Sequence, residues 1–446
     1  MEHKPPIHIG SMSVDIPQFV KNIIERLHRS GFEAFAVGGA IRDFCLHRPI
    51  MDWDVTTSAT PKEIQTVFND LRSFSLKQKT VTIVHTGSHC EVTTFRGNRK
   101  QAASLLEDLG HRDFTINAMA YDIKTEAIID PFDGMGDIQK KMVRAVGKPE
   151  DRFHEDPIRL LRAVRIANDL GFHIEQSTLD TISLMADQLT KAAMERIRDE
   201  LMKILLSRRP SKGFRLMSQT GLLRQFLPEI LEGRRKKQNA YHQYTIYRHI
   251  METMDQVESE PLMRLTALFH DIAKPRVRQS INHTFRFYGH EEASARLTYE
   301  IMRRLRFSND MVKDVMHLIE NHMIGYDSKW TDGAVRRFIQ RVGVENAANL
   351  ISFRKADLIA HGTLDHKMDL LEELETRIND ITRTPYIKDR IDLAVNGDDV
   401  MKILGLRPGP AVGKVLKTLM ERVTESPEYN NKDVLVAMIQ EMVNYT

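Results

Sequence analysis

Two aspartates one residue apart, in the run Asp52-Trp53-Asp54-Val55-Thr56-Thr57, constrain this chain more than any other feature. The apolar and β-branched residues around them favour a strand, on which side chains i and i+2 point to the same face. Asp52 and Asp54 would therefore face one cleft. Carboxylates hold hard cations such as Mg²⁺, and a metal pair can activate an attacking oxygen while it stabilises the leaving one. The alternative is an exposed strand end with two solvated acids, which is common on protein surfaces.

The residues upstream favour the metal interpretation. The run Ala34-Phe35-Ala36-Val37-Gly38-Gly39-Ala40-Ile41-Arg42-Asp43 predicts a buried strand, a glycine pair and the start of a helix. Glycines allow a ligand close to the backbone, and the free N–H groups of a helix start attract phosphate. Arg42 would add a charged hydrogen-bond donor. By itself a glycine pair before a helix is most often a plain turn, so the phosphate interpretation depends on the aspartates that follow.

The patterning of the chain changes near Met142. Before it, apolar residues at helical spacing predict a helix over 16–29, and strand-like runs follow at 34–37, 52–56, 80–85, 90–95 and 127–129. After it, nearly every segment has helical spacing. A chain of 446 residues is expected to form about two to four domains. The expected fold class is α+β, with a small mixed sheet and helices first and an all-α remainder.

Composition limits the compartment and the partners. The 64 Lys and Arg nearly balance the 61 Asp and Glu, so a surface for nucleic acid has to come from local clustering. The two cysteines, Cys45 and Cys90, exclude a disulfide framework and suit a reducing cytosol. The first residues contain Pro5, Pro6 and Pro17 in place of a long apolar run, and no stretch of about eighteen apolar residues follows. We expect a soluble, cytoplasmic protein.

Further motifs follow in a recognisable order. They are Glu91-Val92-Thr93-Thr94-Phe95, Arg112-Asp113-Phe114-Thr115-Ile116-Asn117-Ala118, Ile129-Asp130-Pro131-Phe132 and Glu155-Asp156-Pro157-Ile158-Arg159-Leu160-Leu161-Arg162-Ala163. With the glycine pair and the aspartates, this order resembles the nucleotidyltransferase superfamily that contains the tRNA CCA-adding enzymes and the bacterial poly(A) polymerases. The resemblance is to the class II tRNA nucleotidyltransferases. It extends more weakly to the last segment, 393–399 with Gly405, Gly409 and Gly413.

The resemblance implies the roles of the head residues. Asp52 and Asp54 would carry catalysis and bind Mg²⁺, and Glu91 would be a third acid near the metals unless it is a plain surface glutamate. Arg112 and Asp113 match the motif that holds the triphosphate and sugar, and Asn117 is expected on the same helix face as Asp113. The implied nucleotide-binding residues are Gly38, Gly39, Arg42, Arg112, Asp113, Asn117, Asp156, Arg159, Arg162 and Arg165.

The next predicted helix carries Asp156, Arg159, Arg162 and Arg165. Periodicity alone favours a solvated face with i,i+3 ion pairs. In the family, however, the matching Glu-Asp-x-x-Arg motif reads the incoming base. Cytosine presents an N4 amino donor and acceptors at N3 and O2, which a carboxylate and a guanidinium complement. Adenine, with a donor at N6 and an acceptor at N1, can use the same pair after small shifts.

A second constellation lies further along the chain. His270-Asp271 interrupts an apolar helical run, and a buried polar pair of this kind needs partners, which metal coordination would supply. With His249 before it and Asp357 after it, the order resembles the HD metal-dependent phosphohydrolases. That resemblance implies metal ligands at His249, His270, Asp271 and Asp357, and His290 and His322 fit the extra histidines of binuclear members. Chance spacing is the alternative, because the chain has 18 histidines.

These resemblances imply four domains. A catalytic nucleotidyltransferase head would span 1–140, a helical neck with base-reading and tRNA-binding helices 141–235, an HD-type helical body 236–375, and a helical tRNA-binding tail 376–446. Basic residues cluster between Lys140 and Arg165 and at Arg234-Arg235-Lys236-Lys237. They are candidate contacts for tRNA phosphates, although a charge run is usually a solvated face.

The preferred function is transfer of CMP, with ATP as a further substrate in a full CCA-adding enzyme, to the 3′ end of tRNA. A bacterial poly(A) polymerase is the first alternative, but such enzymes usually carry a strongly basic tail and this C-terminal region is mixed in charge. A phosphohydrolase using Ni²⁺, Co²⁺ or Mn²⁺ at the HD site, with a non-catalytic head, is the alternative of another class. The intact head motifs disfavour it. An HD domain can also persist as a scaffold.

One departure from the family pattern concerns a loop. Between Phe95 and Arg112 there are only sixteen residues, and Leu105-Leu106-Glu107-Asp108-Leu109 occupies the end of that span. Full CCA-adding members carry a longer flexible loop here, with a Tyr/Asp/Arg/Pro-containing segment, that helps the base-reading pair change from CTP to ATP. The shortened loop resembles the CC-adding branch, which stops after two cytidines. A separate A-adding enzyme would then be a partner acting in sequence. Loops also tolerate length change, so a neutral deletion is the alternative.

Overall fold

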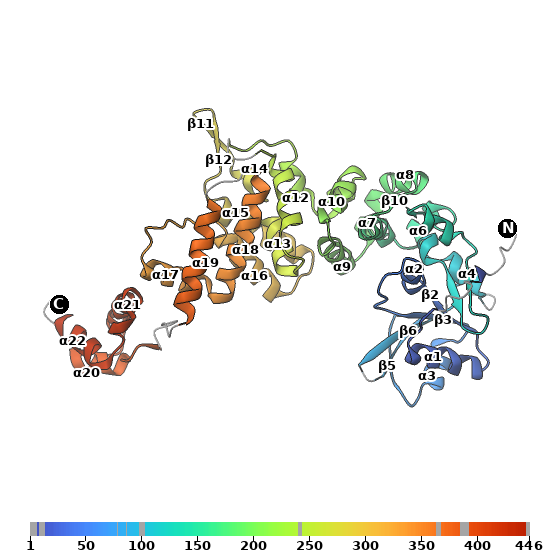
Figure 1. The fold of residues 1–446 in the computed structure, drawn as a ribbon, viewed down its shortest axis with the longest axis horizontal. Coiled ribbons are helices and arrows are strands. Elements are labelled where there is room, and N and C mark those ends of the chain that lie inside the picture. The colour runs from blue at the N-terminus through green and yellow to red at the C-terminus, as the bar shows by residue number, and fades with distance from the viewer. Residues whose placement is uncertain are drawn as a thin grey trace. The chain divides into compact units, whose positions relative to one another are not determined.

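The computed structural model describes residues 7–8, 14–77, 79–85, 87–97, 103–239, 243–362, 367–383 and 392–442. The chain forms two compact units, residues 1–228 and residues 229–446 (Figure 1). Among the described residues, the first unit combines a sheet with helices, and the second consists of helices and one hairpin. The structure therefore confirms the predicted α+β class. The finer division into head, neck, body and tail stays a prediction.

Eight strands of the described residues form one mixed sheet in the order β1-β8-β7-β2-β3-β6-β5-β4. They are β1 (Ile7–His8), β2 (Ala34–Val37), β3 (Asp54–Thr57), β4 (Arg72–Lys77), β5 (Thr80–His85), β6 (Ser88–Thr94), β7 (Ala120–Asp122) and β8 (Ala127–Ile129). Strands β3 and β6 are parallel, and the other neighbouring pairs are antiparallel. The predicted bounds of β2, β5 and β8 are confirmed. The sequence did not predict β1, β4 and β7.

The strand predicted over 52–56 begins at Asp54, so Asp52 lies before β3. The β2–β3 ladder ends where Val37 pairs with Asp54. Gly38 follows Val37 with φ 79° and turns the chain out of the sheet, a conformation that glycine adopts without strain. Neither neighbouring strand continues the pairing to Asp52. The prediction that Asp52 and Asp54 share one strand face is therefore wrong.

The helices of the first unit confirm the helical patterns in outline. The predicted helix at 16–29 begins at Gln18, after Pro17, and buries Val20, Ile23, Ile24 and Leu27. The α-helices are α1 (Gln18–Arg29), α2 (Gly39–Cys45), α3 (Pro61–Val67), α4 (Leu105–Gly110), α5 (Gly134–Gln139), α6 (Pro149–Glu155), α7 (Ile158–Leu170), α8 (Gln176–Leu184), α9 (Met194–Leu205), α10 (Pro210–Gln219) and α11 (Leu222–Phe226). Short 3-10 helices η1 (Thr115–Asn117) and η2 (Ala186–Lys191) complete it, and a third, η3 (Pro228–Gly233), starts at the last residue of this unit and belongs mostly to the second.

The predicted all-α neck requires a correction. Strands β9 (Met142–Val143) and β10 (His173–Ile174) form a short parallel ladder beside α7. This ladder ties the two ends of the segment that contains α6 and α7, because His173 N also donates to the Lys141 carbonyl. Helix α7 packs against α9 and α10. The helices that carry the predicted base-reading residues are thus fixed within the first unit.

The second unit contains a larger and a smaller group of helices. The larger group comprises α12 (Ile246–Gln256), α13 (Pro261–Phe269), α14 (Lys274–Val277), α15 (His290–Arg304), α16 (Asn309–Asn321), α17 (Asp332–Val342), α18 (Val344–His361) and α19 (Lys367–Arg383). The smaller comprises α20 (Gly397–Leu404), α21 (Pro410–Glu425), η5 (Pro427–Tyr429) and α22 (Lys432–Met442). The smaller group has its own apolar core around Val400, Leu419 and Leu435. No helix in the described ranges is both long and apolar enough to cross a membrane.

A hairpin in the second unit was not predicted. Strands β11 (Gln279–Ile281) and β12 (Thr284–Arg286) pair antiparallel. The turn residues Asn282 and His283 have positive φ of 49° and 58°, as a type I′ hairpin turn requires. Helical periodicity alone therefore missed a short element that depends on turn chemistry.

Candidate active site

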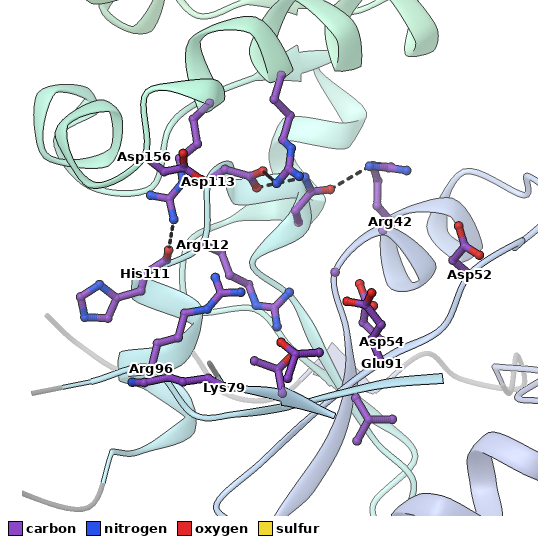
Figure 2. Close-up of a pocket in the computed structure, with 18 of the residues that line it drawn as sticks. Arg42, Asp52, Asp54, Lys79, Glu91, Arg96, His111, Arg112, Asp113 and Asp156 are labelled. Carbon is purple, nitrogen blue, oxygen red and sulfur yellow. Dashed lines mark hydrogen bonds and ion pairs between the residues drawn. The ribbon is translucent and has the colours of Figure 1, made fainter. Parts of the chain in front are cut away.

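A cleft of about 950 Å³ in the first unit gathers the predicted residues (Figure 2). Its walls come from the sheet and from α2, α6, α7 and α9. The predicted residues that line it are Gly38, Gly39, Arg42, Asp52, Asp54, Glu91, Arg112, Asp113, Asn117, Asp156, Arg159, Arg162 and Arg165. The fold thus brings together residues that are more than a hundred positions apart in the chain.

Asp54 and Glu91 form the acidic pair of this cleft. They are register partners on the parallel strands β3 and β6, and both are half-buried. Figure 2 shows their carboxylates side by side, with Asp52 standing apart. The Asp52 side chain is 80% exposed, and its Oδ1 lies 3.8 Å from His89 Nε2. Half-buried carboxylate oxygens suit Mg²⁺, so Asp54 and Glu91 fit this ion, with Asp52 as a third, more exposed acid nearby.

Gly38 leaves room for Arg112 beside this acidic pair. A Cβ on Gly38 would lie 3.0 Å from Arg112 Nη1 and 3.6 Å from Asp54 Oδ2. The φ of 79° adds strain for any other residue. The glycine therefore permits the close approach of a guanidinium to the carboxylates.

Asp108, a residue that we did not predict as part of the site, forms a buried ion pair with Arg112. Its carboxylate is fully buried and accepts hydrogen bonds from Thr56 Oγ1 at 2.9 Å and from the Arg96 backbone N–H at 3.1 Å. Arg112 Nη2 lies 3.3 Å from Asp108 Oδ2. In the sequence, the Leu-Glu-Asp-Leu segment marked only the end of the connection to Arg112, and the fold is needed to place its aspartate against Arg112.

A chain of hydrogen bonds links Arg42 to Asp113. Arg42 Nε and Nη2 donate to the Asp43 carboxylate at 2.9 and 2.8 Å, and Nη1 donates to Asn117 Oδ1 at 2.8 Å. Asn117 Nδ2 donates to Asp113 Oδ1 at 3.1 Å. The predicted shared helix face is wrong, because Asp113 precedes the 3-10 helix η1 that contains Asn117. The two side chains meet nevertheless.

Asp113 stays ionised in this network. Burial alone would raise the pKa of its carboxyl, but the Arg162 guanidinium and the Asn117 amide hold that pKa well below its usual range. Arg162 Nη1 donates to Asp113 Oδ2 at 3.0 Å. Because it remains a carboxylate at neutral pH, Asp113 can accept a hydrogen bond from a sugar hydroxyl.

Asp156 and Arg159 are both oriented by neighbours. Asp156 is the C-cap of α6, so the prediction that one helix carries both residues is wrong. Arg196 Nη1 and Nη2 donate to the two oxygens of Asp156 at 2.9 and 2.7 Å. Arg159 donates to Glu155 Oε2 at 2.9 Å and to the His111 carbonyl at 2.7 Å. Arg159 is 8% exposed, which excludes the solvated-face interpretation for this residue.

Helix α9 supplies two partners that the sequence did not predict, Arg196 and Glu200. Glu200 is 5% exposed, and it accepts a hydrogen bond from Arg165 Nε at 2.6 Å. Its Oε1 lies 3.6 Å from Arg162 Nε. The only signal in the sequence was an arginine and a glutamate four residues apart on an amphipathic helix, a spacing that normally indicates a local ion pair.

The connection between β6 and α4 is short and anchored at both ends. Residues 98–102 of it lie outside the described residues. Ser104 caps α4 in a capping box. A Cβ on Gly97 would lie 2.5 Å from the Cβ of Ala103, so the two ends of the connection touch. The backbone N–H of Arg96 donates to Asp108 at the other end, so Arg96 and Ser104 bound a connection of seven residues.

The second predicted site is a buried cluster in the other unit. His249 Nε2 lies 2.9 Å from Asp357 Oδ1 and 3.5 Å from Asp271 Oδ2. His270 Nε2 lies 3.3 Å from Asp271 Oδ2, 3.5 Å from Asp357 Oδ1 and 3.3 Å from His249 Nε2. A tetrahedral ion with bonds of about 2.1 Å separates its ligands by about 3.4 Å, so these four groups fit one ion.

The same cluster continues on the other side of Asp271. Its Oδ1 lies 3.5 Å from His290 Nε2 and 4.0 Å from His322 Nε2. Asp271 Oδ1 and His290 Nε2 have no hydrogen-bond partner of good geometry among the described residues. Buried atoms of this kind call for a ligand. Lys274 Nζ, 2.6 Å from Asp271 Oδ2, and Arg354, which donates to Asp357, balance part of the negative charge.

Outside these sites, the four cations Arg234-Arg235-Lys236-Lys237 are all exposed, immediately after η3. An exposed run is compatible with RNA phosphates and with a solvated face. Its predicted role therefore stays a prediction, as does that of the helices α20 to α22.

Three family models match parts of the chain. The Poly A polymerase head domain matches residues 34–144, and the probable RNA and SrmB-binding site of polymerase A matches residues 171–233. The putative tRNA nucleotidyltransferase domain 2 matches residues 287–439. The first of these contains the acidic pair, the glycine pair and Asp113.

Similar proteins match over nearly the whole length. The CCA-adding enzyme of Streptococcus thermophilus is 30% identical over 94% of this chain and 96% of its own, and that of Limosilactobacillus reuteri is 31% identical over 94% and 95%. The crystal structure of the Bacillus stearothermophilus CCA-adding enzyme in complex with CTP is 28% identical, with a TM-score of 0.72 over 96% of this chain and 98% of that one. The Thermotoga maritima CCA-adding enzyme complexed with tRNA, at 18% identity and a TM-score of 0.59 over 99% of this chain and 100% of that one, shares the fold.

Proposed function

This chain belongs to the CCA-adding enzyme family of tRNA nucleotidyltransferases, and from that membership we propose that it adds CMP from CTP to the 3′ end of tRNA. The observation that carries the proposal is the single cleft in which an acidic pair, Asp54 and Glu91, faces Asp113 and the fixed pair Asp156 and Arg159. One wall suits a metal and phosphates, and the other suits a sugar and a base.

Each wall has a distinct task in the reaction. Asp113 and Asn117 bind the ribose of CTP, and Arg42 and Arg112 bind its phosphates beside Gly38. Mg²⁺ held by Asp54, Asp52 and Glu91 would neutralise charge on the α-phosphate. The terminal 3′ oxygen of the RNA bonds to the α-phosphorus while its proton passes to water in the open cleft. The bond from that phosphorus to the bridging oxygen breaks, and pyrophosphate leaves.

The base is selected by side chains instead of a complementary strand. The Asp156 carboxylate accepts a hydrogen bond from the N4 amino group of cytosine, and the Arg159 guanidinium donates to N3 and O2. Arg196 and Glu155 hold these two side chains in place. Because Asp156 and Arg159 are both held in place, this pair is better suited to cytosine alone than to both cytosine and the larger adenine.

We further propose that addition stops after two cytidines. The support is the short connection, in which only residues 97–103 lie between the anchors Arg96 and Ser104. A segment of this length, with touching ends, can reach no further than about 10 Å from its anchors. The longer loop of full CCA-adding members, which helps the template change to ATP, has no counterpart of similar length here.

The experiment offers the wild-type protein two tRNA substrates. On tRNA without its 3′ end we expect two CMP residues to be added. On tRNA ending in CC we expect AMP addition to be about a hundredfold slower than CMP addition, or more, because ATP is held in a template set for cytosine. Radiolabelled CTP and ATP in single-turnover reactions measure both rates. AMP addition at the CMP rate would make the protein a full CCA-adding enzyme.

A loop graft supplies the control. Replacing residues 98–102 by a longer family loop should raise AMP addition and leave CMP addition within about threefold, since the anchors stay in place. A glycine-serine insertion of equal length is the matched control, and AMP addition is expected to stay slow with it. ATP incorporation by the wild type onto any RNA, in long tails, would instead support a poly(A) polymerase.

The buried cluster supports a second candidate activity, a metal-dependent phosphohydrolase in the second unit. Four ligand atoms at tetrahedral separations and the bridging position of Asp271 favour it. His249, His270, Asp271 and Asp357 would hold one ion, and His290 and His322 would hold a second one with Asp271. Ni²⁺, Co²⁺ and Mn²⁺ all accept such mixed nitrogen and oxygen donors.

We expect the double replacement His270→Ala with Asp271→Ala to remove any hydrolysis that Ni²⁺, Co²⁺ or Mn²⁺ stimulates, and to leave CMP transfer within about twofold, since no cluster residue lines the cleft. Phosphomonoesters and cyclic phosphodiesters serve as substrates, and the melting temperature reports folding. The isosteric Asp271→Asn variant should likewise lose the metal-stimulated hydrolysis and keep CMP transfer. Equal hydrolysis by wild type and Asp271→Asn would contradict the assignment, and no hydrolysis by the wild type with any of the metals would make the cluster a scaffold.

A further inference from the structure

One corner of the cleft holds more positive than negative charge. Lys79, Arg96 and Arg112 line it, and Figure 2 shows Lys79 and Arg96 next to each other. The nearby carboxylate is Asp108, which is already paired to Arg112 at 3.3 Å and lies 4.0 Å from Arg96 Nε. Lys79 is exposed. Among the described residues, this corner therefore holds three cations around Asp108, with the acidic pair Asp54 and Glu91 on the far side of Arg112.

The other arginines of the cleft are matched to carboxylates. Each has an oxygen within 3.0 Å, in the pairs Arg42 with Asp43, Arg159 with Glu155, Arg162 with Asp113, Arg165 with Glu200, and Arg196 with Asp156. Arg96 instead has like charges for neighbours. Burial and the positive charge of Arg112 lower the pKa of Arg96, with a further contribution from Arg159. An anion in this corner would relieve that repulsion.

Two hydroxyl groups lie between these cations and the acidic pair. Thr80 Oγ1 and Thr93 Oγ1 are 3.0 Å apart on β5 and β6, and both residues line the cleft. Thr93 is two residues beyond Glu91 on β6, so the two side chains share a face of the sheet at a separation of about 7 Å. The sheet face therefore presents carboxylates, then hydroxyls, then cations.

We propose that Lys79 and Arg96, with the Thr80 and Thr93 hydroxyls, bind the phosphodiester on the 5′ side of the terminal nucleotide of the RNA. This inference rests on the proposed function and assigns the primer side of the same cleft. A terminal nucleotide has its own 3′ hydroxyl one sugar away from that phosphodiester. Binding the phosphate at the cations therefore brings the attacking oxygen to Asp54 and Glu91.

The incoming triphosphate has a different place. Arg42, one of its proposed ligands, donates to Asn117. Arg112, the other, lies between the two sides, beside Gly38 and against Asp108. In the view of Figure 2, the Asp54 and Glu91 carboxylates separate Lys79 and Arg96 from Asp52 and Arg42. An in-line displacement needs the attacking and leaving oxygens on opposite sides of the α-phosphorus. Lys79 and Arg96 lie on the side away from Arg42 (Figure 2), so they are suited to bind the RNA whose 3′ oxygen attacks.

The backbone holds Arg96 in this position without its side chain. Asp108 Oδ1 accepts from the Arg96 N–H, and Gly97 follows against Ala103. Truncating the Arg96 side chain therefore leaves the Asp108 contact and the short connection intact. The residue can be tested without loss of the fold.

The test measures KM for tRNA lacking CCA and KM for CTP separately, in full-length Lys79→Ala and Arg96→Ala variants. Each variant is expected to raise KM for tRNA about tenfold and to leave KM for CTP within twofold, because one charge-assisted contact is lost. The slope of log affinity against log salt should become shallower by about 0.7 for each lost contact. Arg96→Lys, which keeps the charge, should recover most of the loss.

A modified RNA identifies the phosphate. With an uncharged methylphosphonate at the last internucleotide linkage, the KM of the wild type for the RNA should rise about tenfold. In Lys79→Ala and Arg96→Ala the same modification should raise that KM little further, because the contact is already lost. Lys62→Ala and Arg29→Ala, two exposed cations away from the cleft, are matched controls. The assignment would be overturned by a rise in KM for CTP in either variant or by an unchanged KM for tRNA. It would also be overturned if the effects of the variant and of the methylphosphonate on KM for the RNA were additive. If wild type adds no CMP at all, the proposed function fails instead.

Discussion

Replacing Asp54 by alanine is expected to lower the rate of CMP transfer at least about a thousandfold while the melting temperature and tRNA affinity change little. A metal ion held by Asp54 would neutralise charge on the α-phosphate and so stabilise the transition state by several kcal/mol, and each 1.4 kcal/mol is a factor of ten in rate. Asp54 is half-buried at the start of β3, beside Glu91 on β6, and lines the cleft. Its loss removes a ligand without opening a cavity. Single-turnover transfer from CTP measures the rate.

Asp52→Ala is expected to have a similarly large effect through a different route. The carboxylate is 80% exposed and precedes the strand, so it would join Asp54 and Glu91 as a ligand only by turning toward them. Its loss should therefore raise the Mg²⁺ concentration needed for half-maximal rate as well as lower the rate. Asp54→Asn tests charge at constant shape, and Asp15→Ala, an exposed acid of the same unit, is the matched control. Transfer within a few-fold of wild type in both Asp52→Ala and Asp54→Ala would show that these two carboxylates do not take part in the reaction.

The strands that the sequence predicted well are those whose side chains are buried. Ala34–Val37 is buried at each position and Thr80–His85 at its first four, so continuous or alternating apolar residues marked them. The edge strand β4 has the mixed sequence Arg-Ser-Phe-Ser-Leu-Lys and depends on backbone pairing with β5. Pairing of this kind leaves little signature in residue type. Strand existence was therefore predictable in the centre of the sheet and not at its edge.

The motifs predicted which residues line the cleft, but not how they are held. Arg196 and Glu200 orient Asp156 and Arg165 from a helix about forty residues further along the chain. Asp108 reaches Thr56 across more than fifty residues. Periodicity reports which face of one element is apolar, and it carries no information about which element packs against that face. Partners that come from tertiary packing needed the structure.

The register of β3 illustrates the same limit for the acidic residues. Two acids at i and i+2 share a face only while the strand lasts, and the glycine that opens the cleft also ends the ladder at Asp54. The close carboxylate pair thus joins Asp54 to Glu91, from another motif. Composition and spacing predicted an acidic site, and strand pairing decided its members.

The base-reading pair gives the second large effect. Asp156→Asn is expected to lower the preference for CTP over UTP at least about tenfold, with KM for tRNA unchanged within twofold. The substitution keeps the shape but replaces one acceptor oxygen by an NH₂ donor, which opposes the N4 amino group of cytosine and tolerates the O4 carbonyl of uracil. A bidentate base contact is worth about 1–3 kcal/mol of discrimination. Competition between CTP and UTP for the same tRNA measures the ratio.

The contacts of this pair decide which variants are informative. A full charge reversal would set an arginine at 156 against Arg196, which now donates to both oxygens of Asp156, and an aspartate at 159 against Glu155. Such a protein would lose selectivity through repulsion within the helices as well as through base reading. We expect its nucleotide selectivity to change more than its affinity for tRNA. Asp156→Asn keeps one oxygen for Arg196. Asp169→Ala, near the end of helix α7, which carries Arg159, and outside the cleft lining, is the matched control. An unchanged CTP to UTP ratio in Asp156→Asn, with selectivity retained in Asp169→Ala, would mean that Asp156 only anchors Arg196 and does not read the base.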